Sequence, residues 1–553
     1  MSKMSKKVTE NRANEVNAVP ANGHENFMGG ISYSLNPLET LKMITASSIF
    51  GEPQYYRAGE FAEARVKDGI CRISPIFRPY VVSGTDMDGK KTSDIMEQAI
   101  DAALSYDFGA TLDWAMTLRK EFYMRLNPQV IMVRAAMHPD REKFTSANPG
   151  VFAKINDVVM ARADEPASQL TYYLYRNGSK ASVPNLLKRS WAKRIERMSD
   201  YDMYKYRNKG IGLIDTIRIC HANNERINSL MKTGTIDMEE NEKTWETLRA
   251  AGKSWKEILE TIKMGHMALL RNLRGIFTEI NDVDYCEKVL AELKNGVLKG
   301  KQYPYRYYTA MKNIENANVN HKAMILDALE ECMNIACDNM PKLKGKTMCL
   351  SDNSGSAWGT IPSEYGSVTI ANIDNLSSVI TARNSQDGYV GKFGDKLFSI
   401  PVKKTNGVLD QTKEIEDNPR YSVGGSTENG IWLFFDKAIR EKEHWDNIFI
   451  YSDQQAGHGG LYGIDSSQYK DYVVRSGYGG RYIDVAKLID VYRKKVNPKV
   501  NVYSIQTAGY DDVLVPENGY RTTILYGWTG KELVYADAMN KFWDEVDAKN
   551  SKN

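Results

Sequence analysis

The chain has 553 residues, of which 73 are Lys or Arg and 70 are Asp or Glu, so its formal net charge is only +3. Hydrophobic residues make up 42% of it and charged residues 26%, as in ordinary soluble globular proteins. These values exclude a disordered chain, a collagen-like repeat and a uniformly basic nucleic-acid binder, and the length predicts about two to four domains.

The N-terminal residues 1–23 contain lysines but no apolar stretch behind them, which predicts a flexible leader rather than a secretory signal. Nowhere do about 18 apolar residues follow one another, so we expect no membrane span and no membrane partner. The six cysteines form no CxxC pair, a pattern typical of free thiols in a reducing compartment. We therefore expect a cytoplasmic protein.

Residues from about 38 to 340 read as a succession of short amphipathic helices with little strand signal. Apolar residues recur at helical spacing in four clear segments: 93–107, 111–126, 151–163 and 254–273. Short breakers containing Gly or Pro separate such segments, and no strict sequence period is present. The pattern predicts an α-solenoid of degenerate HEAT-like repeats, a fold that presents a long surface for binding.

The periodicity changes near residue 345, where short apolar or β-branched runs begin. Four of these runs read as buried strands: 347–352, 447–453, 499–507 and 520–528. Helices are expected at 430–442 and 480–495, and residues 358–405 are expected to hold one helix and two edge strands. Strands alternating with helices predict a parallel, doubly wound α/β domain. The predicted parts are a leader (1–23), an all-α HEAT-like module (24–343) and an α/β module (344–553).

Oxygen donors gather where the predicted α/β strands end, at the edge at which doubly wound sheets bind ligands. The candidate ligands are Asp352, Ser354, Ser356, Thr427 and Asp453. Oxygen-only ligation suits a hard divalent cation, with Mg²⁺ expected and Mn²⁺ or Ca²⁺ as alternatives. The set resembles the metal-ion-dependent adhesion site (MIDAS) of von Willebrand factor A domains. Two alternatives stay open: Ser426 could replace Thr427, and the DxSxS motif could serve only as a helix cap.

The sequence contains no motif that indicates catalysis. A Walker GxxxxGK[ST] loop, a GxSxG elbow and an HExxH pair are all absent from it. A hydrolase would also need a general base or a nucleophile beside the metal. We therefore expect a non-enzymatic protein whose metal recruits a partner's carboxylate or orders the surrounding loops.

The helical module contains one strongly basic window. Between Arg176 and Gly210 ten Lys or Arg residues face three acidic residues, so this window carries +7. Tyrosines are interleaved with the cations, and the combination suits single-stranded RNA because cations neutralise phosphates while rings stack on bases. A solvated helix face with half-buried tyrosines explains the composition equally well.

Several stretches, in collinear order over nearly the whole chain, resemble Ro ribonucleoproteins, the TROVE-domain family. They are 26–44, the Tyr55-Tyr56 pair, 205–210, DTIRICHAN (215–223), MALLRNLRGI (267–276), YPYRYYTAMK (303–312) and DNSGS (352–356). ALLRNL and DxSGS are the most specific of these. Three features depart from the family pattern: Asn353 replaces the Val of DVSGS, Ala357 replaces a Met, and the GGT loop reads Gly-Gly-Ser-Thr. Residues 65–95 match poorly.

The resemblance implies a ring of HEAT-like repeats whose ends are joined by a von Willebrand A domain. In that plan, single-stranded 3′ ends of misfolded RNA enter a basic hole, and a small noncoding Y RNA binds the outer surface. The candidate RNA-binding residues are Lys205, Arg207, Lys209, His221, Arg176, Lys188, Arg189 and Arg194. A buried helix position is the alternative for His221.

The sequence thus predicts a monomeric RNA-binding scaffold that acts in noncoding RNA binding and RNA quality control, with a ribonuclease or another protein as a further partner. The competing hypothesis is a metal-dependent protein-interaction scaffold that binds no RNA. A metal-dependent phosphodiesterase is a third and weaker hypothesis.

Overall fold

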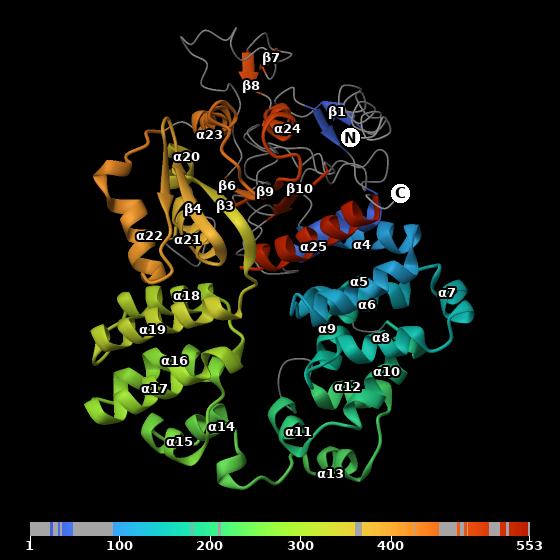
Figure 1. Cartoon of the computed structure of the whole chain (residues 1–553). Coiled ribbons are helices and arrows are strands. Elements are labelled where there is room, and N and C mark those ends of the chain that lie inside the picture. Colours follow the sequence, from blue (N-terminus) through green and yellow to red (C-terminus); the bar gives the residue numbers. More distant parts are fainter. Residues whose placement is uncertain are drawn as a thin grey trace. The chain divides into compact units, whose positions relative to one another are not determined.

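The computed structural model divides the chain into two compact units (Figure 1). It describes residues 23–25, 31–33, 36–47, 92–178, 181–207, 212–359, 368–425, 427–452, 473–475, 481–483, 485–507, 520–526 and 530–550. One unit comprises residues 100–340, and the other combines residues 1–99 with 341–553. The division lies three residues before the boundary expected at 343/344, and the chain before residue 100 groups with the α/β unit rather than with the helices.

The helical unit begins with a stack of short helices. Helix α4 (Thr92–Tyr106) spans the division between residues 99 and 100. The helices that follow are α5 (Phe108–Lys120), α6 (Leu126–Met137), α7 (Arg141–Ala147), α8 (Val151–Val159), α9 (Glu165–Asn177), α10 (Asn185–Ile195), α11 (Asp200–Tyr206), α12 (Leu213–Cys220) and α13 (Glu225–Thr233). Helix α5 packs on α6 and α8, α6 packs on α9, and α10 packs on α8 and α12. The fully buried Trp191 of α10 lies in this core.

A second stack completes the helical unit. Its helices are α14 (Trp245–Ala250), α15 (Trp255–Thr261), α16 (His266–Glu279), α17 (Val283–Gly300), α18 (Pro304–Glu315) and α19 (Lys322–Ala336). Helix α16 packs on α17 and α18, and α19 packs on α17 and α18, around the fully buried Tyr307. Helices that pack on near neighbours in both stacks confirm the predicted helical repeat.

The segment 254–273, in which the apolar spacing is continuous, contains two helices instead of one. Helix α15 ends at Thr261, and α16 begins after Gly265, whose backbone is extended at the N-cap position. Met264, between the two helices, is buried. The apolar pattern therefore continues through the break, and the periodicity alone did not reveal it.

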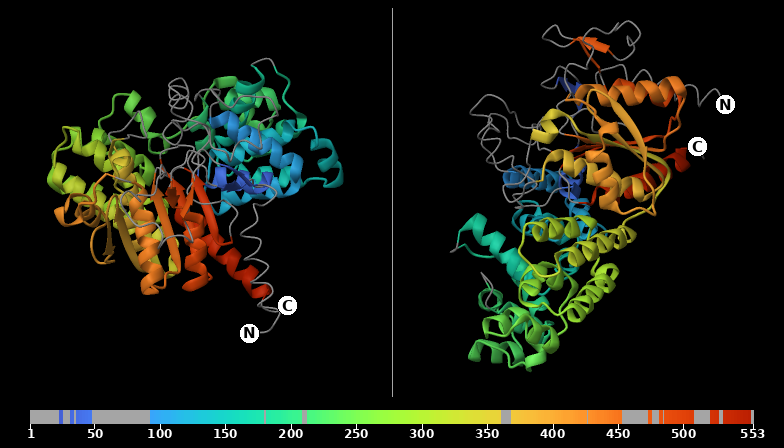
Figure 2. Two further views of the ribbon diagram at one scale, coloured as in Figure 1. Left: turned by 90° about the horizontal axis from the view of Figure 1, so that it is seen from above. Right: turned by 90° about the vertical axis from the view of Figure 1, so that its left-hand side faces the viewer.

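The α/β unit is built on a six-stranded sheet in the order β10-β9-β6-β3-β4-β5 (Figures 1 and 2). The strands are β3 (Leu343–Asp352), β4 (Ser385–Phe393), β5 (Leu397–Pro401), β6 (Asn447–Ser452), β9 (Asn501–Gln506) and β10 (Thr522–Tyr526). All neighbours pair in parallel except β5, which is antiparallel to β4. Strands β6 and β9 are buried along their whole length, so both faces of the sheet are covered there.

The helices of this unit are α20 (Gly355–Gly359), α21 (Ile370–Arg383), α22 (Val408–Asp417), α23 (Thr427–Glu441), α24 (Val485–Lys495) and α25 (Glu532–Asn550). All four predicted strands are present, and so is the doubly wound arrangement. Segment 358–405 contains one full helix and two strands as expected, but β4 lies inside the sheet and only β5 is at an edge. The helix expected at 480–495 starts later, because residues 481–483 form a short strand.

Short elements complete the described part of the α/β unit. Two antiparallel pairs are present, β1 (Gly23–Glu25) with β2 (Ile31–Tyr33) and β7 (Val473–Arg475) with β8 (Arg481–Ile483). Helix α2 (Pro37–Ser47) packs on β10 and α25, although the sequence suggested that it would belong to the helical module.

Candidate metal site and basic surface

Three of the candidate metal ligands converge at the end of β3. The Asp352 side chain is fully buried, and its Oδ1 accepts a hydrogen bond of 2.9 Å from the backbone N–H of Ser354. The hydroxyls of Ser354 and Ser356 lie 3.1 Å apart. One carboxylate and two hydroxyls therefore meet within one turn of chain, in the order that the DxSxS motif predicts.

The neighbouring strand contributes a donor that the sequence did not suggest. Ser452, the last residue of β6, donates a hydrogen bond of 2.6 Å to Oδ2 of Asp352. The predicted ligand Asp453 is the next residue and lies outside the described part of the chain. Thr427 is the first residue of α23, but its side chain is not described, and Ser426 also lies outside the described residues.

The loop before α23 is tied to the DxSxS turn by backbone contacts. The N–H of Gly355 donates to the carbonyl of Gly425 at 3.0 Å, and the N–H of Gly425 donates to Asp395 Oδ2 at 3.0 Å. Gly424 has φ +78°, and a Cβ there would lie 1.9 Å from Asp395 Oδ2, so this position requires glycine. The extra residue in the Gly-Gly-Ser-Thr loop therefore follows two glycines, Gly424 and Gly425, that pack closely against Asp395 and Gly355.

The Asn353 side chain, the departure from DVSGS, points away from the hydroxyl cluster. It is 2% exposed and forms a reciprocal amide pair with Asn375 of α21, with hydrogen bonds of 2.9 and 3.1 Å. Asn375 Oδ1 also accepts a hydrogen bond of 2.7 Å from Ser351. The buried amides are therefore satisfied, and they hold the turn that carries Ser354 and Ser356.

The donor set fits a hard divalent cation, because carboxylate and hydroxyl oxygens are the ligands that Mg²⁺ accepts. Among the described residues, no group of three His, Cys, Asp or Glu side chains is arranged to hold a metal. The candidate site differs from such a group because two of its ligands are the serine hydroxyls of Ser354 and Ser356. The resident cation remains a prediction.

The cations of the basic window are spread along helices α9 and α10. Arg176 is in the last turn of α9, and Lys188 and Arg189 are in the first half of α10. Arg194 lies at the other end, where its guanidinium donates to the carbonyl oxygens of Met160 (2.9 Å) and Ala161 (3.3 Å) just before α9.

Some tyrosines of the window are buried in the core, and others are exposed at the surface. Tyr172, Tyr173 and Tyr204 are buried, so for these three the half-buried core explanation is right. Tyr175 and Tyr201 are 70% and 42% exposed. A cation lies over each exposed ring, Arg176 at 5.2 Å from the Tyr175 centroid and Lys205 at 5.5 Å from that of Tyr201.

Helix α11 combines cations with tyrosine rings. The Lys205 ammonium lies 5.5 Å from the Tyr201 ring centroid and 5.4 Å from that of Tyr206. The Arg207 guanidinium lies 4.0 Å from the Tyr204 ring centroid. These cation–π contacts hold both cations beside ring faces.

Two further candidates lie after α11. Lys209 is outside the described residues. His221 is exposed and forms the left-handed C-cap of α12 with φ 57°, so the alternative of a buried helix position is wrong.

Residues 223–349 match the family model described as the TROVE domain. This part of the chain is thus similar to the TROVE domain. The match includes the ALLRNL and YPYRYYTAMK segments that carry part of the resemblance, whereas Lys205, His221 and Asp352 lie outside it.

Among solved structures, the crystal structure of the Deinococcus radiodurans Ro (RSR) protein is similar to this chain. The TM-score is 0.55 at 14% sequence identity, and the alignment covers 82% of this chain and 95% of that chain. No curated protein sequence matches. The likeness shows the fold, helical repeats with a von Willebrand A-like α/β unit, as the TROVE resemblance implied.

The sequence also led us to expect no membrane span and no disulfides. The described helices include none that is long and apolar enough to cross a membrane. The five cysteines in the described ranges are buried, and no disulfide joins them, as expected for a reducing compartment.

Proposed function

We propose that this TROVE-domain protein is a non-enzymatic RNA-binding ribonucleoprotein scaffold. The TROVE match and the Ro-like fold support the class of function. The observation that carries the proposal is the α11 surface, where Lys205 is held beside the rings of Tyr201 and Tyr206. Cations bind phosphates and exposed rings stack on bases, so this surface suits unpaired RNA.

The RNA partners would be of two kinds. Single-stranded 3′ ends of misfolded RNA would contact Lys205, Arg207 and Lys209, with weak sequence preference because phosphate contacts do not distinguish bases. A small Y-like noncoding RNA would contact the exposed His221. Together the two would serve RNA quality control in the cytoplasm, and the ring that the resemblance implies would admit only threadable ends.

The α/β unit would hold a divalent cation through Asp352, Ser354, Ser356, Thr427 and Asp453. Such a cation would supply a coordination position for a partner's carboxylate. The chain's own residues would orient that position: Ser452 fixes Oδ2 of Asp352, and the amide pair of Asn353 and Asn375 fixes the turn. A ribonuclease or another protein is the partner that we expect there.

The decisive experiment compares two double variants in RNA binding. Lys205→Ala with Lys209→Ala should weaken binding of a structured RNA with a single-stranded 3′ tail. The slope of log affinity against log salt should also become shallower by about 0.7 for each phosphate that the variant no longer binds. The control is Lys437→Ala with Lys541→Ala, which removes two exposed, ion-paired lysines of the α/β unit. Unchanged affinity and slope in the first variant would show that the proposed RNA site is wrong.

A metal-dependent protein-interaction scaffold is the second candidate, favoured by the convergent oxygens at the end of β3. The two functions differ in what copurifies with the protein. A high ratio of absorbance at 260 nm to that at 280 nm, abolished by ribonuclease treatment, supports RNA binding. Protein partners captured only with Mg²⁺ and without RNA would support the alternative.

A further inference from the structure

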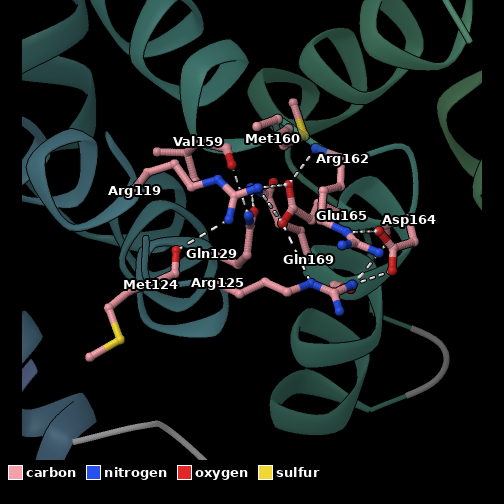
Figure 3. A network of polar contacts seen from close by, with 12 residues as sticks. Arg119, Met124, Arg125, Gln129, Val159, Met160, Arg162, Asp164, Glu165 and Gln169 are labelled. Atoms are coloured by element: carbon pink, nitrogen blue, oxygen red, sulfur yellow. Dashed lines mark hydrogen bonds and ion pairs between the residues drawn. The ribbon is translucent and has the colours of Figure 1, made fainter. Parts of the chain in front are cut away.

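A second group of cations, distant in sequence from the basic window, lies in the helical unit beside α11. We call it the arginine cluster: Arg119, Arg125 and Arg162, with the carboxylates of Asp164 and Glu165 (Figure 3). Its members come from the end of α5, the turn before α6, the turn before α9 and the first residue of α9. The sequence analysis singled out none of them.

The buried part of the arginine cluster is an ion pair between Arg119 and Glu165. Glu165 is fully buried, and its Oε1 lies 2.9 Å from Nη2 of Arg119, whose side chain is 12% exposed. Burial raises the pKa of the Glu165 carboxyl and lowers the pKa of the Arg119 guanidinium, so each charge depends on the other. The backbone N–H of Arg162 also donates to Glu165 Oε2 at 2.7 Å. The Arg119–Glu165 ion pair and this hydrogen bond therefore hold the end of α5 against the turn before α9.

The outer part of the arginine cluster faces solvent. The side chains of Arg125 and Arg162 are 49% and 50% exposed, and both pair with Asp164, which is 20% exposed. Arg125 Nε also lies 3.6 Å from Glu165 Oε1, and Arg162 also donates to the Tyr206 hydroxyl. Each guanidinium has five N–H donors, and these few acceptors cannot accept all ten. Two positioned arginines therefore present donors to solvent, and the nearby carboxylates fix their orientation without cancelling their charge.

The arginine cluster continues the proposed RNA surface. Nη2 of Arg162 donates to the Tyr206 hydroxyl at 3.3 Å, and the ring of the same tyrosine contacts Lys205 on α11. Arg194 binds the carbonyls of the two residues that precede Arg162. The cations around this surface are Arg119, Arg125, Arg162, Arg194 and Lys205, and the carboxylates are Asp164 and Glu165 together with Asp200 and Asp202 in the first turn of α11.

An exposed aromatic residue lies two positions before Arg125 in the chain. Tyr123, in the turn that contains Arg125, is 55% exposed, and the ammonium of Lys301 lies 5.4 Å from its ring centroid. Phosphate-binding forks beside an exposed ring are the combination that single-stranded nucleic acid requires. A sulfate- or carboxylate-specific site would need no ring.

We propose that Arg125 and Arg162 form an additional phosphate-binding subsite for single-stranded RNA, with Tyr123 as a stacking face beside it. The inference rests on the proposed RNA-binding function and extends the α11 surface onto the α5–α6 and α8–α9 turns. Arginine suits this task because its planar fork matches a phosphate, and arginines that are already oriented lose less entropy on binding. Arg119 and Glu165 are positioning residues.

The test measures binding of a 3′-labelled single-stranded oligouridine to the full chain at salt concentrations from about 50 to 200 mM. Arg125→Gln with Arg162→Gln should weaken binding about tenfold and lower the salt slope by about 0.7 for each arginine. The control is Lys437→Gln with Arg440→Gln, two ion-paired cations of α23. That control should match the unmodified protein.

A third variant separates RNA contact from structural support. Asp164→Asn removes a competing carboxylate, so it should leave affinity unchanged or raise it up to about threefold, even if thermal stability falls. If the arginines served only to join helices, Asp164→Asn and the double arginine variant would both lower stability and leave the affinity of the folded protein unchanged. That result would overturn the inference.

The inference and the proposed function fail in different ways. If Lys205→Ala weakens oligouridine binding but Arg125→Gln with Arg162→Gln does not, the arginine subsite is wrong and RNA binding stands. If the unmodified protein binds no oligouridine or structured RNA at any salt concentration, the proposed function fails and the subsite fails with it.

Discussion

Replacing Gln169 with Leu should selectively loosen the first helical stack. The Gln169 amide, fully buried in α9, donates hydrogen bonds of 2.7 Å to both Gln129 and Asn156. Its Oε1 accepts one of 2.7 Å from Nε1 of Trp191. Leucine has a similar volume but can replace none of these bonds. Gln129 and Trp191 each lose one hydrogen bond, and Asn156 loses two because its Nδ2 also donates to Gln169 Oε1 at 3.4 Å (Figure 3 shows Gln129 and Gln169).

The expected cost follows from those three partners. Each buried polar group left unpaired costs about 1–3 kcal/mol, and the costs within one network do not add fully, so we expect a total of about 4 kcal/mol. Hydrogen exchange is the suitable assay because the chain has two units and exchange reports local free energy. Amide protection in α6, α8, α9 and α10 should fall about a thousandfold, since about 1.4 kcal/mol corresponds to a factor of ten.

Two comparisons make that measurement decisive. Protection in the sheet of the α/β unit should stay unchanged and serves as the internal reference. Gln302→Leu is the matched control, because Gln302 makes one hydrogen bond, to the carbonyl of Gly300. A loss of protection smaller than about tenfold in α9 would show that the buried amide network contributes little to stability.

Three other perturbations have defined outcomes. Asp352→Ala should abolish any Mg²⁺-dependent rise in melting temperature, and a full rise in that variant would place the cation elsewhere. Asn375→Ala should weaken the same response by about tenfold in Mg²⁺ concentration, since it removes the partner of Asn353, whereas an unchanged midpoint would show that the amide pair does not position the turn. Burial lowers the pKa of His266, whose Nε2 lies 2.7 Å from the Tyr307 hydroxyl, so its contribution to stability is complete above about pH 6.5 and is lost as pH falls toward its folded pKa. Melting of His266→Phe should therefore depend less on pH between about 5 and 7 than melting of the unmodified chain, and identical profiles would contradict this assignment.

Local sequence pattern predicted the α/β unit well because its strands are buried on both faces. A strand such as β6 reads Asn-Ile-Phe-Ile-Tyr-Ser, and continuous burial produces a continuous apolar run that needs no long-range information. The turn after β3 was equally visible, because Asp352, Ser354 and Ser356 lie within five residues of one another. Asn375 was not, because its contact with Asn353 joins positions 22 residues apart in sequence.

The basic surface was harder to predict for the same reason. A window in sequence groups residues along the chain, whereas helix packing separated Arg176 from Arg194 and brought Arg125 and Arg162 toward α11. Buried tyrosines such as Tyr172 and exposed ones such as Tyr175 are also alike in composition and differ only in the helix face that they occupy. The fold could be predicted from the periodicity of the sequence. Which cations lie together on the basic surface could not, because that depends on contacts between helices that are distant in sequence.

If the proposed RNA surface is right, the separation of basic groups along α9 implies a length requirement for RNA. Glu165 and Arg176 are 11 residues apart on one helix, so the two ends of α9 lie about 16 Å from each other. A strand with stacked bases advances about 3.4 Å per nucleotide, and roughly five nucleotides are needed to span that distance. Shorter oligomers would therefore bind one end only, while longer ones would bind both ends with the benefit of a high effective concentration. If RNA binds as proposed, the length of helix α9 would therefore set the shortest RNA that can contact both groups of cations at once.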